Sequence, residues 1–462
     1  MISRKFPLIV FLVLIAASNL VSVATCLTNL GYITIKEDTD ELPVNDFYNR
    51  KAFYAANRFW VFFVDDVNAF RYASSPTGLN GSWIFGSTIE QLSSSDIDVK
   101  YDTGGNYFYY VYHRGTPILT SYTRKGTPNS DGSISWTASA FAPPNLWYAI
   151  HDQEEACMSF NKDDSVWYGR KVYIDASPDY WDYLVTLNNV SSGTQDPSPP
   201  IAGRLRYHGT GVSFPTGHYT LSAVNGSGNQ EAFAFYADDA GVNITYRRFV
   251  SGAWGAEVLL DDLGHLTPRA IQCVADGSNL YFLFADSSSM PFLYQWNGSA
   301  WSGGEQPINS TSITDFGLTV DLGNHTAYMV YSSDNMQTVK VVSRARADID
   351  GIWTTVFNWS PVEHPGYEMA AWSEITTPEY VGVYSSGSNV TKNISVYFGW
   401  FGGPFAYSLD FINMETYSHL MIPPPGPGPY RGPGQMISDT IPILVLIGLV
   451  GGAIIIIKRR RD

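Results

Sequence analysis

Short runs of alternating apolar and polar residues, each ending in an aromatic residue and a polar turn, recur along most of the chain. The strings RFWVFFVDD, NYFYYVYHRG, RKVYIDAS, EAFAFYADD, NLYFLFADSS, TAYMVYSSDN and EYVGVYSSGS show this pattern. The aromatic residues that end the runs stand roughly 47 to 63 positions apart: Phe63, Tyr112, Tyr173, Tyr236, Phe284, Tyr331 and Tyr384. Alternation with a period of two predicts β-strands. A repeat of about 40–60 residues built from short strands is typical of a radially repeated sheet.

The second repeat shows the unit most clearly. Its segments DIDVKYD, NYFYYVYH, PILTSYTR and SISWTAS read as four strands with Gly, Asn, Asp and Ser at the gaps. Turn residues between alternating segments indicate antiparallel hairpins. The body of the chain holds no stretch with a helical apolar period over three turns. The sequence therefore predicts an all-β fold, a seven-bladed β-propeller. Six or eight blades stay open, because the third repeat is irregular.

A tryptophan closes five of the repeats: Trp83, Trp136, Trp254, Trp301 and Trp353. Because the space between neighbouring blades widens away from the axis, we expect these flat side chains to fill that wedge. The seventh repeat has no clear closing tryptophan. Its sheet could be completed by segment 405–411 or by the early segment 31–37. A strand from the opposite terminus would close the ring and remove a free edge.

Both ends of the chain carry membrane-targeting signals. Residues 1–25 have a short basic start, a hydrophobic run and small residues, which predicts a secretory signal, with a retained signal anchor as the alternative. Residues 438–458 contain the uncharged run IPILVLIGLVGGAIIII, long enough for a transmembrane helix. The basic tail 459–462 places the C-terminus in the cytoplasm. The sequence predicts a single-pass protein of the cell membrane with an extracellular body.

The remaining residues divide into a body and a stalk. Residues 421–437 are so rich in Pro and Gly that they cannot build a core, and we expect an extended stalk there. Residues 28–420 are then the ectodomain. Three cysteines argue against a disulfide scaffold, and we expect Cys157 and Cys273 to be buried thiols rather than a bridge.

Charge and sequons narrow the class of partner. The net charge of −15, with only 28 Lys and Arg, opposes nucleic acid as a partner. In an exported chain, the ten Asn-x-Ser/Thr sequons predict N-glycosylation. The sequon residues are Asn80, Asn189, Asn225, Asn243, Asn297, Asn309, Asn324, Asn358, Asn389 and Asn393.

Two features of the chain resemble known families. The loop before the last strand of two repeats is similar to the Asp-box, Ser-x-Asp-x-Gly-x-x-Trp, of sialidase-type propellers. Asp131 and Trp136 have the family's spacing, as do Asp348 and Trp353, but Gly is not in place in either copy. The loops NGSW, SGAW and NGSAW lack the Asp at that spacing. The plan of the whole chain, with signal, propeller, stalk, anchor and basic tail, resembles that of archaeal cell-surface proteins.

The turns between second and third strands of a blade share a face with the connections between blades, and we expect ligand-binding loops on that face. The candidate residues are Asp65, Asp66, Asp175, Asp238, Asp239, Asp286, Asp261, Asp262 and His265. Acidic oxygens that converge near an axis could hold Ca²⁺ or bind sugar hydroxyls. The alternative is that Asp is a favoured turn residue because its side chain caps its own backbone.

The sequence contains no catalytic signature. A Gly-x-Ser-x-Gly elbow, a His-Glu-x-x-His motif and a phosphate loop are all missing, and the eight histidines show no ligand spacing. We therefore predict no catalytic residue, no metal site and no cofactor apart from the Ca²⁺ alternative. The predicted function is a surface binding or structural envelope protein whose partner is a glycan or another surface protein. The alternative is an extracellular carbohydrate-active enzyme, glycosidase- or sialidase-like, which would need two carboxylates flanking the scissile bond.

Overall fold

The computed structural model describes residues 27–39 and most of residues 50–417, with gaps of which the longest are 137–152, 190–200, 209–218 and 360–374. All of these residues belong to one compact unit, Met1–Ser418, and the second unit, His419–Asp462, holds none of them. The predicted signal, transmembrane helix and tail lie outside the described residues, as does the stalk. Within the described part of the chain, no helix is long and apolar enough to cross a membrane.

The described residues form strands and no helix, and the strands belong to seven antiparallel sheets. The first sheet contains β2 (Ala52–Ala55), β3 (Arg58–Val64), β4 (Ala69–Ser75), β5 (Ile84–Phe85) and β6 (Glu90–Gln91). The second contains β7 (Ile97–Asp102), β8 (Tyr107–Arg114), β9 (Thr120–Pro128) and β10 (Ile134–Trp136). The third contains β11 (Gln153–Phe160), β12 (Ser165–Ile174), β13 (Tyr180–Asn189) and β14 (Ile201–His208).

The next three sheets follow the same plan. The fourth contains β15 (Tyr219–Ala223), β16 (Ala232–Ala237), β17 (Asn243–Val250), β18 (Ala253–Trp254) and β19 (Val258–Asp262). The fifth contains β20 (Ala270–Asp276), β21 (Asn279–Ala285), β22 (Pro291–Trp296) and β23 (Trp301–Glu305). The sixth contains β24 (Ile313–Asp321), β25 (Thr326–Ser333), β26 (Thr338–Ala345) and β27 (Thr354–Trp359).

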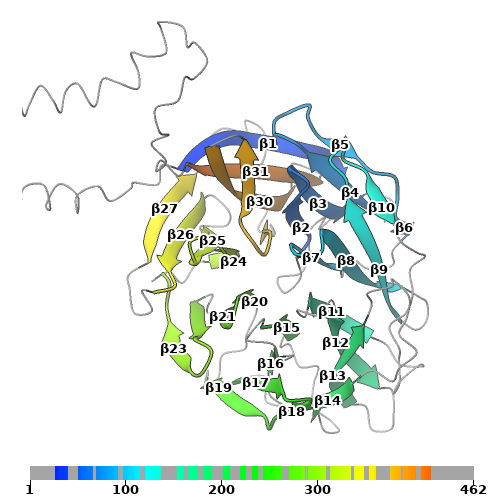
Figure 1. The fold of residues 1–462 in the computed structure, drawn as a ribbon, viewed down its shortest axis with the longest axis vertical. Coiled ribbons are helices and arrows are strands. Elements are labelled where there is room, and N and C mark those ends of the chain that lie inside the picture. The colour runs from blue at the N-terminus through cyan, green and yellow to red at the C-terminus, as the bar shows by residue number, and fades with distance from the viewer. Residues whose placement is uncertain are drawn as a thin grey trace, which may run out of the picture. The chain divides into compact units, whose positions relative to one another are not determined.

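The sheets stand around a common centre, and in the first six sheets the first strand lies nearest to it (Figure 1). In the first six sheets each strand pairs with the one before it in the chain, apart from β6 and β19, which pair with β4 and β17. This is the radial arrangement of short sheets that the repeats predict. In the second sheet, the first two predicted segments match β7 and β8 within one residue. β9 begins three residues later than expected, and β10 covers residues 134–136 of the fourth predicted segment.

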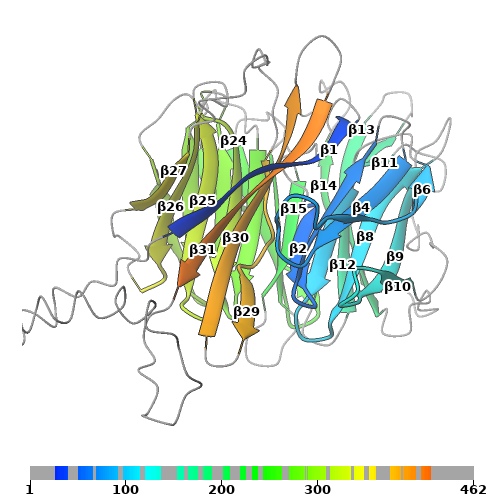
Figure 2. The same cartoon turned by 90° about the horizontal axis from the view of Figure 1, so that it is seen from above.

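The seventh sheet combines both ends of the described chain. It contains β28 (Ile375–Thr376), β29 (Gly382–Ser386), β30 (Asn389–Phe401), β31 (Tyr407–Tyr417) and β1 (Leu27–Thr39). β1 pairs with β31 from Leu27 opposite Thr416 to Thr39 opposite Tyr407 (Figure 2). The two segments that were alternatives for completing this sheet therefore both belong to it, and a strand from the opposite terminus covers the edge of β31.

Six of the seven repeat aromatics lie in the second strand of their sheet, as the repeat predicts. Tyr384 does not: it lies in β29, the inner strand, and the turn after it leads from Ser386 to Asn389 in the second strand. The expectation that all seven turns share one face is therefore wrong for this repeat. Alternation identifies a strand but not its position within a sheet. In this sheet the outer strand, β1, comes from the N-terminal part of the chain, so the strand with Tyr384 is the inner one.

Aromatic side chains fill the spaces between neighbouring sheets. Phe235 and Phe282 stack across the fourth and fifth sheets with ring centroids 4.1 Å apart. Trp301 of the fifth sheet packs on Phe235 of the fourth, and Trp83 of the first packs on Phe411 of the seventh. The wedge-filling role is confirmed for these tryptophans and for Trp254, which contacts Trp167 of the third sheet. Trp136 differs, because its ring packs on Phe108 and Tyr110 of its own sheet.

Polar side chains near the centre join each sheet to the next. Between the first and second sheets, Arg50 donates its backbone N–H to Asp98. The same carboxylate accepts from Met158 of the third sheet at 2.9 Å. The remaining junctions around the ring are made by Ala223 N–H to Ser159, Thr220 with Cys273, Leu318 N–H to Gln272, Ile375 N–H to Asp315, and Lys51 N–H to Thr376. Every neighbouring pair among the seven sheets is thus linked by at least one such bond.

The two cysteines in the described residues, Cys157 and Cys273, are buried and are not bonded to each other. They lie in β11 and β20, the inner strands of the third and fifth sheets. The expected buried thiols are confirmed. Burial raises the pKa of the Cys273 thiol to about 11, so this group is protonated at neutral pH.

Candidate functional site

The inner strand of the seventh sheet is interrupted between β28 and β29. Residues 377–381 leave that sheet and bond instead to β24 of the sixth sheet. Val320 donates its N–H to the carbonyl of Glu379 at 3.0 Å, and Val381 donates its N–H to the carbonyl of Val320 at 3.0 Å. Pro378, in this interruption, has no N–H with which to continue the original ladder. The consequence is a short ridge, residues 377–381, that carries Glu379 and Tyr380 at the centre of the ring.

Two cations from outside the seventh sheet, one just before β2 and one in β7, hold this ridge. Arg50 is 2% exposed, and its Nη1 donates to the carbonyl oxygens of Thr377 and Pro378 at 3.2 and 3.3 Å. Lys100 of β7 places its Nζ 3.7 Å from Oε2 of Glu379. Both cationic side chains are buried, so the ion pair and hydrogen bonds act with little competition from solvent. The position of the Glu379 carboxylate is therefore set by contacts from outside its own sheet.

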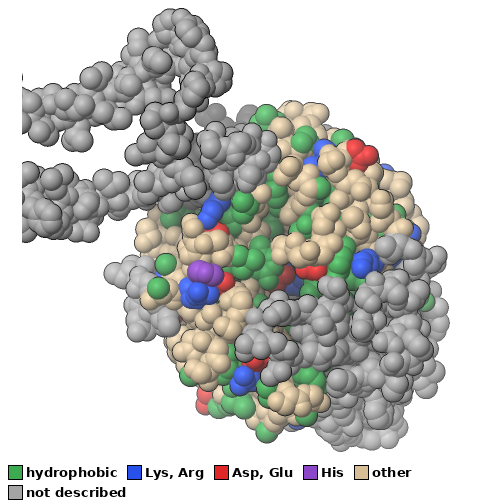
Figure 3. Space-filling model, viewed as in Figure 1, with side chains coloured by type: hydrophobic (Ala, Val, Ile, Leu, Met, Phe, Trp, Pro, Cys, Tyr) green, Lys and Arg blue, Asp and Glu red, His purple; other side chains and the backbone are tan. Residues whose placement is uncertain are grey.

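Two cavities have residues of the ridge in their linings. The larger, of about 340 Å³, is lined mainly by residues of β2, the end of β7 and the ridge itself. The smaller, of about 250 Å³, is lined by the inner ends of the second to sixth sheets. Five residues line both: Tyr101, Thr103, Leu322, Glu379 and Tyr380. Figure 3 shows a hollow at the ring centre with hydrophobic and acidic side chains around it.

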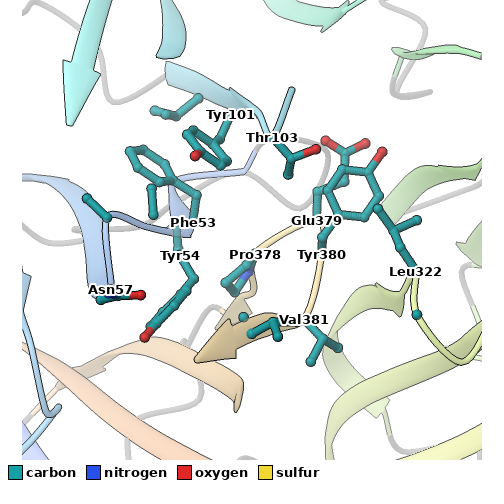
Figure 4. Close-up of a pocket in the computed structure, with 17 residues that line it drawn as sticks. Phe53, Tyr54, Asn57, Tyr101, Thr103, Leu322, Pro378, Glu379, Tyr380 and Val381 are labelled. Carbon is teal, nitrogen blue, oxygen red and sulfur yellow. The ribbon is translucent and has the colours of Figure 1, made fainter. Parts of the chain in front are cut away.

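The side chains in the larger cavity divide into a hydrogen-bonding end and an aromatic end (Figure 4). Thr103, Glu379 and Tyr380 extend toward the same end in this view. Away from them, Tyr101 stacks on Phe53 with ring centroids 5.1 Å apart and an interplanar angle of 8°. Such a stack fixes the orientation of the Tyr101 ring.

Tyr54 completes the aromatic end by packing against a glycine. A Cβ added to Gly382 would lie 2.6 Å from Cγ of Tyr54, so a side chain at 382 would displace the tyrosine. Both residues line the larger cavity. Glycine at this position therefore sets the shape of the aromatic end.

The phenols of the site stay protonated at neutral pH. Burial, with a smaller effect of Asp102, raises the pKa of Tyr101 to about 12. Burial and the nearby Glu379 hold the pKa of Tyr380 well above its usual range. Tyr380 can therefore donate a hydrogen bond, Thr103 can donate or accept one, and a Glu379 carboxylate accepts. Combined with the aromatic rings in the lining, this set of groups suits a ligand with many hydroxyls and an apolar face.

The cavities lie among the turns that join first and second strands. Asn57 follows β2, Thr103 follows β7, Gly277 follows β20 and Leu322 follows β24. Because successive strands run in opposite directions, these turns are on the face opposite to the turns between second and third strands. The cavities are therefore on the other side of the ring from the loops that the sequence analysis favours.

The predicted acidic residues that the structure describes are engaged in local contacts. Asp65 accepts from Ala69 N–H at 2.9 Å and pairs with Arg71 at 2.6 Å. Asp286 accepts from the N–H groups of Ser288 and Met290 at 2.8 and 3.0 Å. Both carboxylates thus cap their own turns, which is the alternative that turn chemistry offers.

The other predicted residues are not gathered with these two. Asp261 and Asp262 lie in β19, at the outer edge of the fourth sheet, and Asp261 accepts from the hydroxyl of Tyr294 at 2.7 Å. Five of the predicted residues lie outside the described part of the chain: Asp66, Asp175, Asp238, Asp239 and His265. Their role in ligand binding stays a prediction.

The structure does not test the predicted alternative of a Ca²⁺ site. Among the described residues, no three His, Cys, Asp or Glu side chains are grouped as ligands of a metal ion. Because much of the predicted acidic set is outside those residues, the Ca²⁺ alternative stays a prediction.

The sequons differ in exposure. Asn80, Asn297, Asn324 and Asn358 are exposed on the folded surface. Asn393 of β30 is only 4% exposed, and its position in the closed sheet makes it less suited to carry a glycan. Asn225 and Asn309 lie outside the described residues. N-glycosylation itself stays a prediction.

No repeat or motif in the sequence singles out the ridge or its two central side chains. One signal was present: Pro378 stands directly before Glu379 and Tyr380 at the start of the alternating string EYVGVYSS. Proline inside a strand-like segment indicates a break in pairing. The contact that makes the break a site, with Val320, joins residues about 60 positions apart, and no local pattern shows it.

The comparisons with known proteins concern the fold. No family model matches the sequence, and neither does any curated protein. Among solved structures, an ulvan lyase of polysaccharide lyase family PL25, bound to -[GlcA(1-4)Rha3S]-, has a TM-score of 0.51 and 11% identity over 82% of this chain and 97% of its own. The fold is a β-propeller. The similarity to the lyase shows a shared fold, and the ring of radial sheets identifies that fold as a propeller.

Two lectins are more distant from this propeller. The BP39L lectin of Burkholderia pseudomallei has a TM-score of 0.49 and 13% identity over 79% of this chain and 98% of its own. The six-bladed lectin of Aleuria aurantia has a TM-score of 0.40 and 12% identity over 71% of this chain and 100% of its own.

Proposed function

We propose that this protein is a carbohydrate-binding β-propeller and that its binding site is the pair of cavities at the ring centre. One observation carries the proposal: hydrogen-bonding groups of Thr103, Glu379 and Tyr380 share a cavity with the ring of Tyr101. Sugar hydroxyls take up such donors and acceptors, and the apolar face of a pyranose packs on an aromatic ring. The ulvan lyase with a similar fold is bound to a polysaccharide fragment, which supports the same ligand class.

The propeller has seven blades in this proposal and is held at the outer surface of the cell membrane. Seven sheets and the hydrogen bonds at each of their junctions support the blade number. The hydrophobic start of the chain, the Pro/Gly-rich segment and the uncharged run 441–457 with its basic tail support the anchoring. The protein would then act as a surface lectin of the archaeal cell-envelope type.

A second candidate function is a carbohydrate-active enzyme. It is favoured by two carboxylates, Asp102 and Glu379, that line the same smaller cavity. However, the oxygens of Asp102 accept from the N–H groups of Gly104 and Gly105 at 2.9 and 3.0 Å. A carboxylate that caps its own turn is a poor general acid or nucleophile, so binding is the better supported function.

The test is a glycan array probed with the full chain and three variants. We expect the wild type to bind a defined set of glycans, and Tyr101→Ala and Glu379→Ala to lose that binding. Glu231→Ala is the matched control, because Glu231 pairs with Arg248 in the fourth sheet and lines neither cavity. Binding that survives both site substitutions would contradict the proposed site. Release of sugar from the array glycans by the wild type would favour the enzyme.

A further inference from the structure

The charges around the two cavities are one-sided. Of the described residues that line them, Asp102 and Glu379 are acidic and none is Lys, Arg or His. The basic residues at the ring centre, Arg50 and Lys100, contact the ridge but are not part of either lining. A ligand in the cavities therefore meets carboxylate oxygens and hydroxyls, whereas Lys100, the cation that pairs with Glu379, is not among the lining residues.

This arrangement disfavours an anionic ligand. The Glu379 carboxylate would repel a second carboxylate or a sulfate beside it in a partly enclosed site, and its ion pair with Lys100 reduces this repulsion without offering the ligand a cation. Such an anion would also lose its own hydration without a cationic partner in return. A repulsive group of this kind selects against one class of ligand while leaving uncharged ligands unaffected.

The two cavities form a divided site rather than separate ones. They share five lining residues, and the ridge side chains Glu379 and Tyr380 belong to both. Ligand pockets usually measure about 300–1,000 Å³, so the smaller cavity, of about 250 Å³, falls below that range alone. A ligand that uses both must pass the shared residues Glu379 and Tyr380. Neighbouring units of a chain molecule, one in each cavity, satisfy this geometry.

We propose that the site takes an uncharged sugar chain of two or more residues that lies across Glu379 and Tyr380, and that it excludes uronic acid and sulfated sugars. This inference rests on the proposed function. It separates this propeller from the ulvan lyase of similar fold, whose bound fragment contains glucuronic acid and sulfated rhamnose. The exclusion follows from Glu379, and the minimum length follows from the ridge.

The experiment uses isothermal titration of the full chain with paired oligosaccharides. Each neutral di- or trisaccharide that binds on the array is compared with its counterpart carrying a uronate or a sulfate, and with its monosaccharide. We expect the anionic member of each pair to bind at least tenfold more weakly. We also expect the disaccharide to bind at least tenfold more tightly than the monosaccharide.

Two substitutions change the charge at the site in the same direction by different routes. Glu379→Gln removes the anion, and Leu322→Lys adds a cation at a side chain that is 38% exposed and lines both cavities. Each is expected to reduce the discrimination against anionic sugars by at least fivefold. Leu79→Lys is the matched control, since Leu79 is 48% exposed and lines neither cavity, and it should leave the discrimination unchanged.

The outcomes separate this inference from the function on which it rests. Equal binding of neutral and anionic members, or discrimination that survives both charge substitutions, would overturn the charge selection. Monosaccharides that bind as tightly as disaccharides would overturn the chain length. If no sugar of any charge binds to the folded wild type, the proposed function itself is wrong.

Discussion

The carboxylate of Asp98 in the second sheet accepts a hydrogen bond from the backbone N–H of Met158 in the third, with Oδ2 and N 2.9 Å apart. Asp98 is 1% exposed, so this bond is made away from water. Equivalent side chains join the other sheets near the centre, for example Asp315 to Ile375. The ring is therefore closed twice, by aromatic packing between sheets and by polar bonds along the inner strands.

The two buried carboxyl groups, Asp98 and Asp315, should stabilise the fold more in mild acid than at neutral pH. Burial raises the pKa of Asp98 and raises that of Asp315 further, well above its ordinary value. A group whose pKa is higher in the folded state stabilises the fold when protonated, and this contribution is lost as pH rises through the folded-state pKa. We expect the contribution of these two groups to the free energy of unfolding to increase as pH falls from 7 toward about 4.

Denaturant titrations of wild type and Asp315→Asn between these pH values check this expectation. The variant cannot ionise at position 315, so its free energy of unfolding should increase less than that of the wild type as pH falls. Asp131→Asn is the control of opposite sign, because hydrogen bonds from Ser133 lower the pKa of the exposed Asp131. An identical pH dependence in wild type and Asp315→Asn would contradict the role of burial.

Gly382→Ala should damage the site and the fold together. The added Cβ would meet the Tyr54 side chain at 2.6 Å, and overpacking of this kind costs about 1–3 kcal/mol. We expect a lower denaturation midpoint and weaker glycan binding. Gly303→Ala is the matched control, because its Cβ would have no atom within 4 Å. The account of the aromatic end fails if Gly382→Ala binds glycans as the wild type does.

Removal of the early strand should open the ring. Deletion of residues 27–39 takes away β1 and leaves β31 as an unpaired edge. Exposed edges pair with other chains, so we expect a lower unfolding temperature and association into oligomers. Thermal unfolding and size-exclusion chromatography measure these effects. A deletion variant that stays monomeric with an unchanged melting temperature would show that β1 does not close the structure.

Much of the fold was readable from the sequence because it depends on local alternation. Strand positions such as β7 and β8, and the burial of closing tryptophans such as Trp301, follow from the period of two and from flat apolar side chains. The misplacement of Tyr384 has the same origin, since an alternating string fits an inner strand as well as a second strand. Which strand it is depends on β1, more than 340 residues earlier in the chain.

The site was not readable in this way. Its residues come from different sheets, and the ridge exists because Val320 replaces the pairing that Pro378 cannot make. The acidic turns drew attention because Asp is a common ligand, yet Asp65 and Asp286 use their carboxylates to cap their own turns. Composition shows that such groups are present, whereas their availability depends on contacts that only the fold provides.

The most direct test of the central claim is an experimental structure of the full chain with the tightest neutral oligosaccharide found on the array. The account predicts sugar density at the ring centre, with one unit in each cavity and a ring packed near Tyr101. Density confined to the opposite face, among the turns that carry Asp65 and Asp286, would contradict it.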